Sequence, residues 1–237
     1  MAQGKFRDKA VRAAAELTLI VVGVMIALAA DGWKDDRADA ARARDLTRLL
    51  IEDLRGDADD LAQLQAGGLS RDSAIAILMV DYDRGGLPAD SVGTLLSRLN
   101  GSAMEYTARR SAYDALIQTD GLRLVATPEV RASLLDYYQR KQREVERVYG
   151  NYIGRSQEFQ DVAIPLVQLR PSDVSQGLGS WTRWERTLAQ PWSTIVQSTE
   201  LSSALQIYKG YGQGLARRVN EAAEANHELQ SVLTALQ

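Results

Sequence analysis

The feature that most constrains the fold is a hydrophobic segment near the N-terminus. The eighteen residues from Ala13 to Ala30 carry a single charge, on Glu16, and basic residues precede them. As a helix with ~1.5 Å rise per residue, the segment would span roughly 27 Å, close to the hydrocarbon thickness of a bilayer. Trp33 follows where the membrane–water interface is expected. We therefore expect one transmembrane helix over 13–30, after a short basic N-terminal segment over 1–12.

A cleaved signal peptide is the alternative interpretation of this segment. A basic leader, an apolar stretch from Leu17 onward and the triplet Ala27-Leu28-Ala29 fit the secretory pattern. The helical pattern nevertheless continues without a break beyond Asp31, which favours an uncleaved signal-anchor. Basic residues are similarly frequent on both sides of the span, so their count does not decide the orientation. We expect a bacterial inner membrane location, with a cytoplasmic N-terminus and an extracytoplasmic domain.

Glu16 is the unusual residue of the apolar segment. It lies one helical turn after Arg12, so an ion pair at the interface is one interpretation. The alternative is a polar contact with another transmembrane helix, because ionisable groups inside membranes seek a partner. Together with Trp33, Glu16 is a candidate partner contact.

The rest of the chain, 31–237, shows helical spacing of apolar residues and no sustained alternation, which predicts an all-α domain. The anchor helix is expected to continue from about Arg7 to Leu64 and to end at Gly67-Gly68. A separate short helix should begin at Ser70. Further helices are expected after Pro88, over about 108–120, and after the capping pair Thr127-Pro128.

Two later segments alternate apolar steps of three and four residues, as in coiled coils. The first runs from Leu134 to Leu166 and the second from Leu201 to Leu236. With the first helix they predict an elongated antiparallel helical bundle beyond the membrane. Alternatively, one seam pairs with another protein. Asn226 and Gly212 fall on the second seam, and Asn226 is a candidate partner contact.

An irregular stretch between the two heptad segments contains three of the four tryptophans, Trp181, Trp184 and Trp192. Tryptophan is enriched at protein interfaces, so these residues are candidate partner contacts. The other interpretation is that they cap the end of the bundle.

Composition and motifs argue against catalytic sites, metal sites and nucleic-acid binding. The chain has no cysteine and one histidine, His227, so thiolate sites, cysteine zinc sites and histidine clusters are not expected. The net charge of −3 argues against nucleic acid as a partner. An acidic run is interpreted as a solvated helix face rather than a metal site: Glu52, Asp53, Asp57, Asp59 and Asp60. No phosphate loop or catalytic constellation is evident, and we expect no cofactor, no metal site and no catalytic residue.

Two segments resemble a DUF6090-like family of bacterial single-pass membrane proteins. One is the anchor ELTLIVVGVMIALAADGW with the charged helix LTRLLIEDL, and the other is SAYDALIQTDGLRLVATPEVRASLLDYY. This chain departs from the pattern in its Ala-rich anchor. The resemblance implies the topology and the helical fold, and it implies no activity and no site residues.

These observations predict a non-enzymatic accessory or scaffold subunit that docks on a larger bacterial membrane assembly. Respiratory, transport and photosynthetic complexes are all compatible with such a subunit. The expected partners are the lipid bilayer and other membrane protein subunits. The alternative is a four-helix-type ligand-binding or sensor ectodomain that acts through a partner.

Overall fold

The computed structural model describes residues 2–82, 84, 86–99, 106–119, 121–125, 127–171 and 184–235. Side chains are described from Leu19 onward, apart from residues 125 and 168–187. The elements are α1 (Ala2–Tyr82), α2 (Ala89–Leu99), α3 (Ser111–Gln118), α4 (Leu122–Val125), α5 (Pro128–Asp136), the π-helical turn η1 (Tyr137–Lys141), α6 (Gln142–Ala163), the 3-10 turn η2 (Ile164–Leu166), β1 (Val167–Pro171), β2 (Trp184–Leu188), α7 (Trp192–Ile195) and α8 (Thr199–Ala235).

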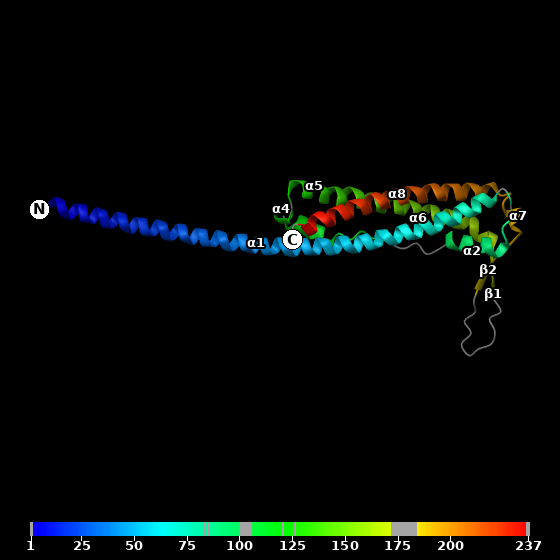
Figure 1. The fold of residues 1–237 in the computed structure, drawn as a ribbon, viewed down its shortest axis with the longest axis horizontal. Helices are drawn as coiled ribbons and strands as arrows, with labels where there is room; N and C mark the ends of the chain where they lie inside the picture. The colour runs from blue at the N-terminus through cyan, green and yellow to red at the C-terminus, as the bar shows by residue number, and fades with distance from the viewer. Residues whose placement is uncertain are drawn as a thin grey trace, which may run out of the picture.

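The described chain is an elongated helical bundle from which half of one helix projects (Figure 1). The predicted all-α class is confirmed. One addition is a small antiparallel pair of strands, β1 and β2, in which Val167 pairs with Leu188 and Pro171 with Trp184. Strand β2 lies within the tryptophan-containing stretch, so the prediction that this stretch is irregular is wrong for residues 184–188.

Helix α1 is a single element of 81 residues, roughly 120 Å long at ~1.5 Å per residue. The predicted end at Gly67-Gly68 and the separate helix from Ser70 are therefore wrong. Gly residues cost a helix interior about 1 kcal/mol each, but packing outweighs this propensity. Leu61 and Leu64 before the glycines and Ile75 after them are all buried on the same side of the bundle.

Three long helical segments form the bundle. Helix α8 packs against both α1 and α6. It is antiparallel to α1, because Ser198, just before α8, accepts from Tyr82, whereas Asn226 in its second half donates to Leu54. It is antiparallel to α6, because Phe159 late in α6 stacks on Tyr208, whereas Lys141, just before α6, pairs with Glu221. The rod made of α5, η1 and α6 runs parallel to α1. The predicted antiparallel arrangement is confirmed, and the short helices α2 and α3 cover α1.

The heptad seam of α8 is confirmed at every described member except Gly212, which is half-buried. Its buried residues are Leu201, Leu205, Tyr208, Leu215, Val219, Ala222, Asn226, Leu229 and Leu233. The predicted seam member Leu236 lies outside the described residues. The earlier seam is only partly as predicted, because the π turn η1 adds a wide turn near its start. As a result Tyr137 and Tyr138 are both buried, and Gln142 rather than Lys141 faces the interior.

Helix α3 ends as the sequence predicts, although it is shorter than expected. The amide of Gly121 donates to the carbonyl of Leu116 at 2.9 Å and closes the helix. Helix α5 begins at the predicted capping pair, where the Thr127 hydroxyl accepts from the amide of Val130 at 3.4 Å. The end of α3 and the start of α5 therefore follow from the residue types at Gly121 and Thr127.

Leu19 to Leu28 of α1 form an exposed apolar stretch that projects from the bundle (Figure 1). Leu19 is 76% exposed, and its neighbours on all sides of the helix are also exposed. Within the part of the chain that the structure describes, no helix is both long enough and apolar enough to cross a membrane. The predicted span also includes residues 13–18, whose side chains lie outside that part. The span stays a prediction.

Candidate functional site

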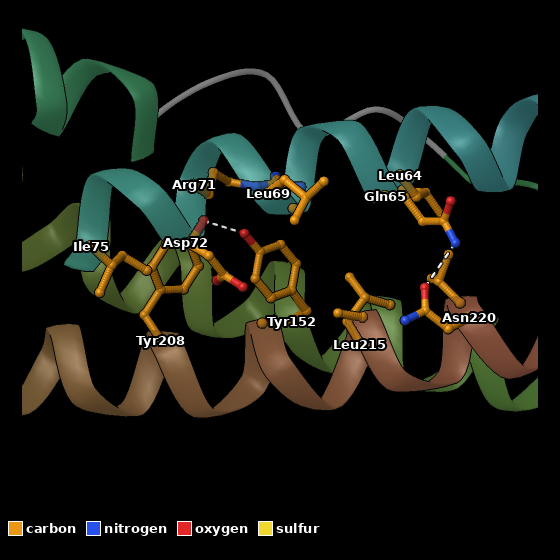
Figure 2. Close-up of a pocket in the computed structure, with 14 residues that line it drawn as sticks. Leu64, Gln65, Leu69, Arg71, Asp72, Ile75, Tyr152, Tyr208, Leu215 and Asn220 are labelled. Atoms are coloured by element: carbon orange, nitrogen blue, oxygen red, sulfur yellow. Dashed lines mark hydrogen bonds between the residues drawn. The ribbon is translucent and has the colours of Figure 1, made fainter. Parts of the chain in front are cut away.

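A pocket of about 320 Å³ lies between α1, α6 and α8 (Figure 2). Its walls are mainly apolar, with Leu64, Leu69 and Ile75 from α1 and Leu215 from α8. Volumes of this size lie at the lower end of the range typical for small-molecule sites. The pocket can therefore hold a small organic molecule.

Two glycines open this pocket. Gly68 of α1 and Gly212 of α8 both line it. An added Cβ would meet nothing within 4 Å at Gly68, and at Gly212 it would lie 3.5 Å from an oxygen of Asp72. Both positions are inside helices, so they do not serve turns. Their contribution is the space that a larger side chain would fill.

Arg71 provides the positive charge at the pocket wall. Its guanidinium lies over the ring of Tyr152, 5.1 Å from the ring centre. Its Nε is buried and has no hydrogen-bond partner, and Arg71 forms no ion pair with any residue that the structure describes. A guanidinium has five N–H donors that suit a carboxylate. Arg71 is thus available to an anionic group in the pocket.

Asp72 also lines the pocket, next to Arg71 in the chain. Partial burial raises the pKa of its carboxyl group, and the positive charges of Arg71 and Lys209 offset part of that increase. The three side chains together carry one net positive charge when all are ionised. The local electrostatics therefore favour a ligand with a single negative charge.

Tyr152 and Tyr208 close the base of the pocket. Their rings are stacked with centroids 5.1 Å apart, and their hydroxyl groups are hydrogen-bonded at 2.5 Å. Burial raises the pKa of the Tyr152 hydroxyl, with the neighbouring Tyr208 as a further cause. At the other end of the pocket, Gln65 donates to Asn220 at 2.8 Å (Figure 2).

Nearer the projecting part of α1, a layer of buried polar groups crosses the bundle. Asp57 is fully buried and accepts hydrogen bonds from Tyr106 at 3.1 Å, from Tyr137, and from Gln142 at 3.0 Å. This layer separates the two apolar clusters of the core. Among the described residues no Lys or Arg forms an ion pair with Asp57, so its partners are neutral donors.

The interpretation of the acidic run as a solvated face is therefore wrong for Asp57. Two other acids of that run also have partners within the bundle. Asp53 accepts from the backbone amide of Ala112 at 2.7 Å, and Asp60 pairs with Arg109 at 2.9 Å. Across the described residues, no group of three or more His, Asp or Glu side chains could hold a metal ion.

Asn226 belongs to the polar layer. It is fully buried and donates to the carbonyl of Leu54 at 3.0 Å and to the Tyr137 hydroxyl at 2.7 Å. Its oxygen accepts a hydrogen bond from Gln230 at 2.6 Å. The structure thus places Asn226 in the core, where it fixes the register of α8 against α1, instead of on a surface for a partner.

The other candidate contacts lie far apart. Trp192 is only 3% exposed, and its indole Nε1 donates to Asp81 at 2.9 Å, so this residue caps the far end of the bundle. Trp33 is 64% exposed on the projecting part of α1, with Arg37 over its ring. Trp181 and the side chains of Trp184 and Glu16 lie outside the described residues. The structure brings none of the described ones together.

A second, shallower hollow of about 340 Å³ lies on the outer side of α6 and α8. Val148 of α6 and Ile207, Gly210, Tyr211 and Gly214 of α8 line most of it. An added Cβ would meet nothing within 4 Å at Gly210 or at Gly214. This face lets another protein approach the α8 backbone closely.

Comparison of the chain with known protein families, curated proteins and solved structures finds no match. The resemblance to the DUF6090-like family is therefore an expectation from the sequence alone. The argument about function depends on the geometry described above.

The sequence reasoning missed the pocket. Its charged residues, Arg71 and Asp72, were expected to belong to a separate short helix. The signal that could have revealed it is the coincidence of Gly68 and Gly212 with apolar seams on two long helices. Glycine at a seam position removes a side chain from the core and leaves space.

Proposed function

We propose that this protein is a non-enzymatic, single-pass membrane accessory or scaffold subunit that docks on a larger bacterial membrane assembly. The observation that carries the proposal is α1 itself, one continuous helix that bears an exposed apolar stretch at one end and packs in the bundle at the other. The proposed orientation has the N-terminus in the cytoplasm and the bundle on the extracytoplasmic side.

The exposed stretch supports an anchor. From Leu19 to Leu28 the large apolar side chains face outward on every side of α1, and the described chain does not cover them. Apolar surface of this extent is unfavourable in water, and a bilayer would remove that cost. With residues 13–18 the segment reaches the lower limit of a spanning helix. Trp33 then lies at the interface.

The continuity of α1 supports a structural function. No break in the helix separates the apolar stretch from the first buried residues, Thr47 and Leu50. About 30 Å of helix therefore separates Leu28 from Thr47, at ~1.5 Å per residue. A helix of this kind holds the bundle at a defined distance from the bilayer, where it can contact the extramembrane part of another subunit.

The outer hollow of α6 and α8 is the face that best fits a docked subunit. It combines the exposed apolar side chain of Ile207 with the open backbone at Gly210 and Gly214. Replacing both glycines by Leu should leave the fold intact, because nothing lies within 4 Å of either added Cβ. The same replacement fills the hollow and blocks docking.

The test is extraction of the full chain from its native membrane in mild detergent, followed by native gel electrophoresis and mass spectrometry. We expect the wild type to migrate in an assembly with stoichiometric membrane subunits. The Gly210→Leu/Gly214→Leu variant should be released from that assembly. Glu224→Leu, at an exposed position of α8 outside the hollow, is the matched control and should remain associated. A wild-type chain recovered only as a monomer would overturn the proposal.

A further inference from the structure

We propose that the pocket between α1, α6 and α8 binds a small amphipathic monocarboxylate, with the carboxylate on Arg71 and the apolar body between Leu64, Leu69 and Leu215. This inference goes beyond the docking function and does not depend on it, because the pocket lies inside the bundle. It rests on the cavity, on a cation in its wall whose buried Nε has no hydrogen-bond partner, and on the apolar character of its lining.

The charge of the ligand follows from the groups that face the pocket. Arg71 has no hydrogen bond or ion pair to a described residue, although its Nε is buried. A buried donor without a partner is costly, and a carboxylate would satisfy it with charge-assisted hydrogen bonds. Asp72 shares the pocket wall with Arg71, and Lys209 acts on Asp72 from outside the lining. The three groups leave a local net charge of +1, which a monoanion would neutralise. A dianion would be repelled by Asp72, and a cation by Arg71.

The size and polarity of the ligand follow from the walls. Apart from the charged pair and the Gln65–Asn220 amides, the cavity of about 320 Å³ is lined by Leu, Ile, Val, Ala, Gly and Tyr residues. An alkyl chain or aromatic ring of modest length would fill such a space by displacing water from apolar surface.

A lipid that stays in the bilayer is a poor fit for this site. Gly68 lies forty residues after Leu28 along α1, which is roughly 60 Å at ~1.5 Å per residue. This separation rests on the proposed membrane anchor. The ligand is therefore a water-soluble acid that reaches the pocket from the aqueous side.

The experiment is equilibrium dialysis of radiolabelled octanoate against the full-length protein in mild detergent. Arg71→Gln removes the charge and retains much of the side-chain volume. Arg155→Gln is the matched control, because Arg155 also lies 5.1 Å from a tyrosine ring centre, that of Tyr211, but does not line this pocket. Both variants share the same partition of octanoate into detergent. Gly68→Leu places a larger side chain in the pocket, and its Cβ meets nothing within 4 Å.

We expect one saturable site in the wild type and in Arg155→Gln. Binding should be roughly ten- to a hundredfold weaker in Arg71→Gln, the loss expected for a charge-assisted hydrogen bond. Binding should be absent in Gly68→Leu, and octan-1-ol should compete only weakly. Circular dichroism of each variant shows whether the bundle is folded. Absence of saturable binding, equal affinity in folded Arg71→Gln, retained binding in Gly68→Leu, or equal competition by octan-1-ol would each overturn the proposal.

Discussion

Gln142 donates from its side-chain amide to the carboxyl group of Asp57 at 3.0 Å, joining α6 to α1 across 85 positions of the chain. The π turn η1 makes this contact possible, because it turns Gln142 inward where a regular heptad would present Lys141. The same turn buries Tyr137, which also donates to Asp57. The layer of buried polar groups around Asp57 thus specifies how α1, α6 and α8 align.

Replacing Asp57 by Ala should destabilise the bundle strongly. The substitution leaves Tyr106, Tyr137 and Gln142 without a shared acceptor, and each buried donor that loses its partner costs about 1–3 kcal/mol. We expect the free energy of unfolding in urea, followed by circular dichroism, to fall by roughly 2–5 kcal/mol. Asp59→Ala, on an exposed position of the same helix, is the control and should change it by less than about 0.5 kcal/mol. Equal effects of the two substitutions would contradict the buried layer.

Gly68→Ala should stabilise the protein. Inside a helix Ala is better than Gly by about 0.5–1 kcal/mol, and the added Cβ meets nothing within 4 Å. If α1 ended here with a left-handed glycine, as the sequence alone suggests, the same change would destabilise instead. The sign of the change in the urea midpoint therefore decides whether α1 is continuous.

Trp192 should be important for stability, unlike Trp33. Trp192 is buried against Tyr82 and donates to Asp81, so Trp192→Ala should cost about 3–5 kcal/mol. Trp192→Phe retains the ring and loses the hydrogen bond, and should cost less. Trp33→Ala is the control for an exposed tryptophan and should leave the urea midpoint of the bundle unchanged. An unchanged midpoint in Trp192→Ala would show that this residue does not cap the bundle.

Alkaline pH should weaken the bundle. Burial raises the pKa of Tyr106, Tyr137 and Tyr152 above their ordinary value of 10.0, with the Asp57 carboxyl as a further cause for the first two. The stabilisation from groups with raised folded-state pKa values is fully present below about pH 10, the unfolded value, and is lost as the pH rises further. The urea midpoint should therefore decline from about pH 10 upward, and Tyr152→Phe should make this decline less steep. A midpoint that is constant through this range would contradict the burial of these hydroxyls.

Much of the architecture can be predicted from apolar spacing. The seam of α8 from Leu201 to Leu233 and the cap at Thr127 follow from residue types and their intervals. The interruptions do not. Gly67 and Gly68 favour a helix end locally, and packing of α1 against α8 and α2 keeps the helix intact. The π turn has no local signal in the sequence. It brings Tyr137 and Gln142 to Asp57, which is distant in the chain, so the contacts that it makes possible cannot be seen in the residues around it.

The candidate site residues also differ in whether local sequence or long-range packing determines their environment. Exposure of Trp33 and the apolar character of the anchor are local properties that the sequence contains. The burial of Trp192 and Asn226 depends on Asp81 and Leu54, each more than a hundred residues away in the chain. The pocket depends on the same long-range register, because Gly68 and Gly212 open it only when α1 and α8 lie side by side.

The most direct test of the membrane-anchored bundle uses the absence of cysteine in the chain. Single cysteines at Val24 and at the exposed Ser203 of α8 would be labelled with a membrane-impermeant maleimide in spheroplasts. The account predicts that Ser203→Cys reacts from the extracytoplasmic side, whereas Val24→Cys reacts only after detergent is added. Labelling of Val24→Cys in intact spheroplasts as fast as Ser203→Cys would contradict it.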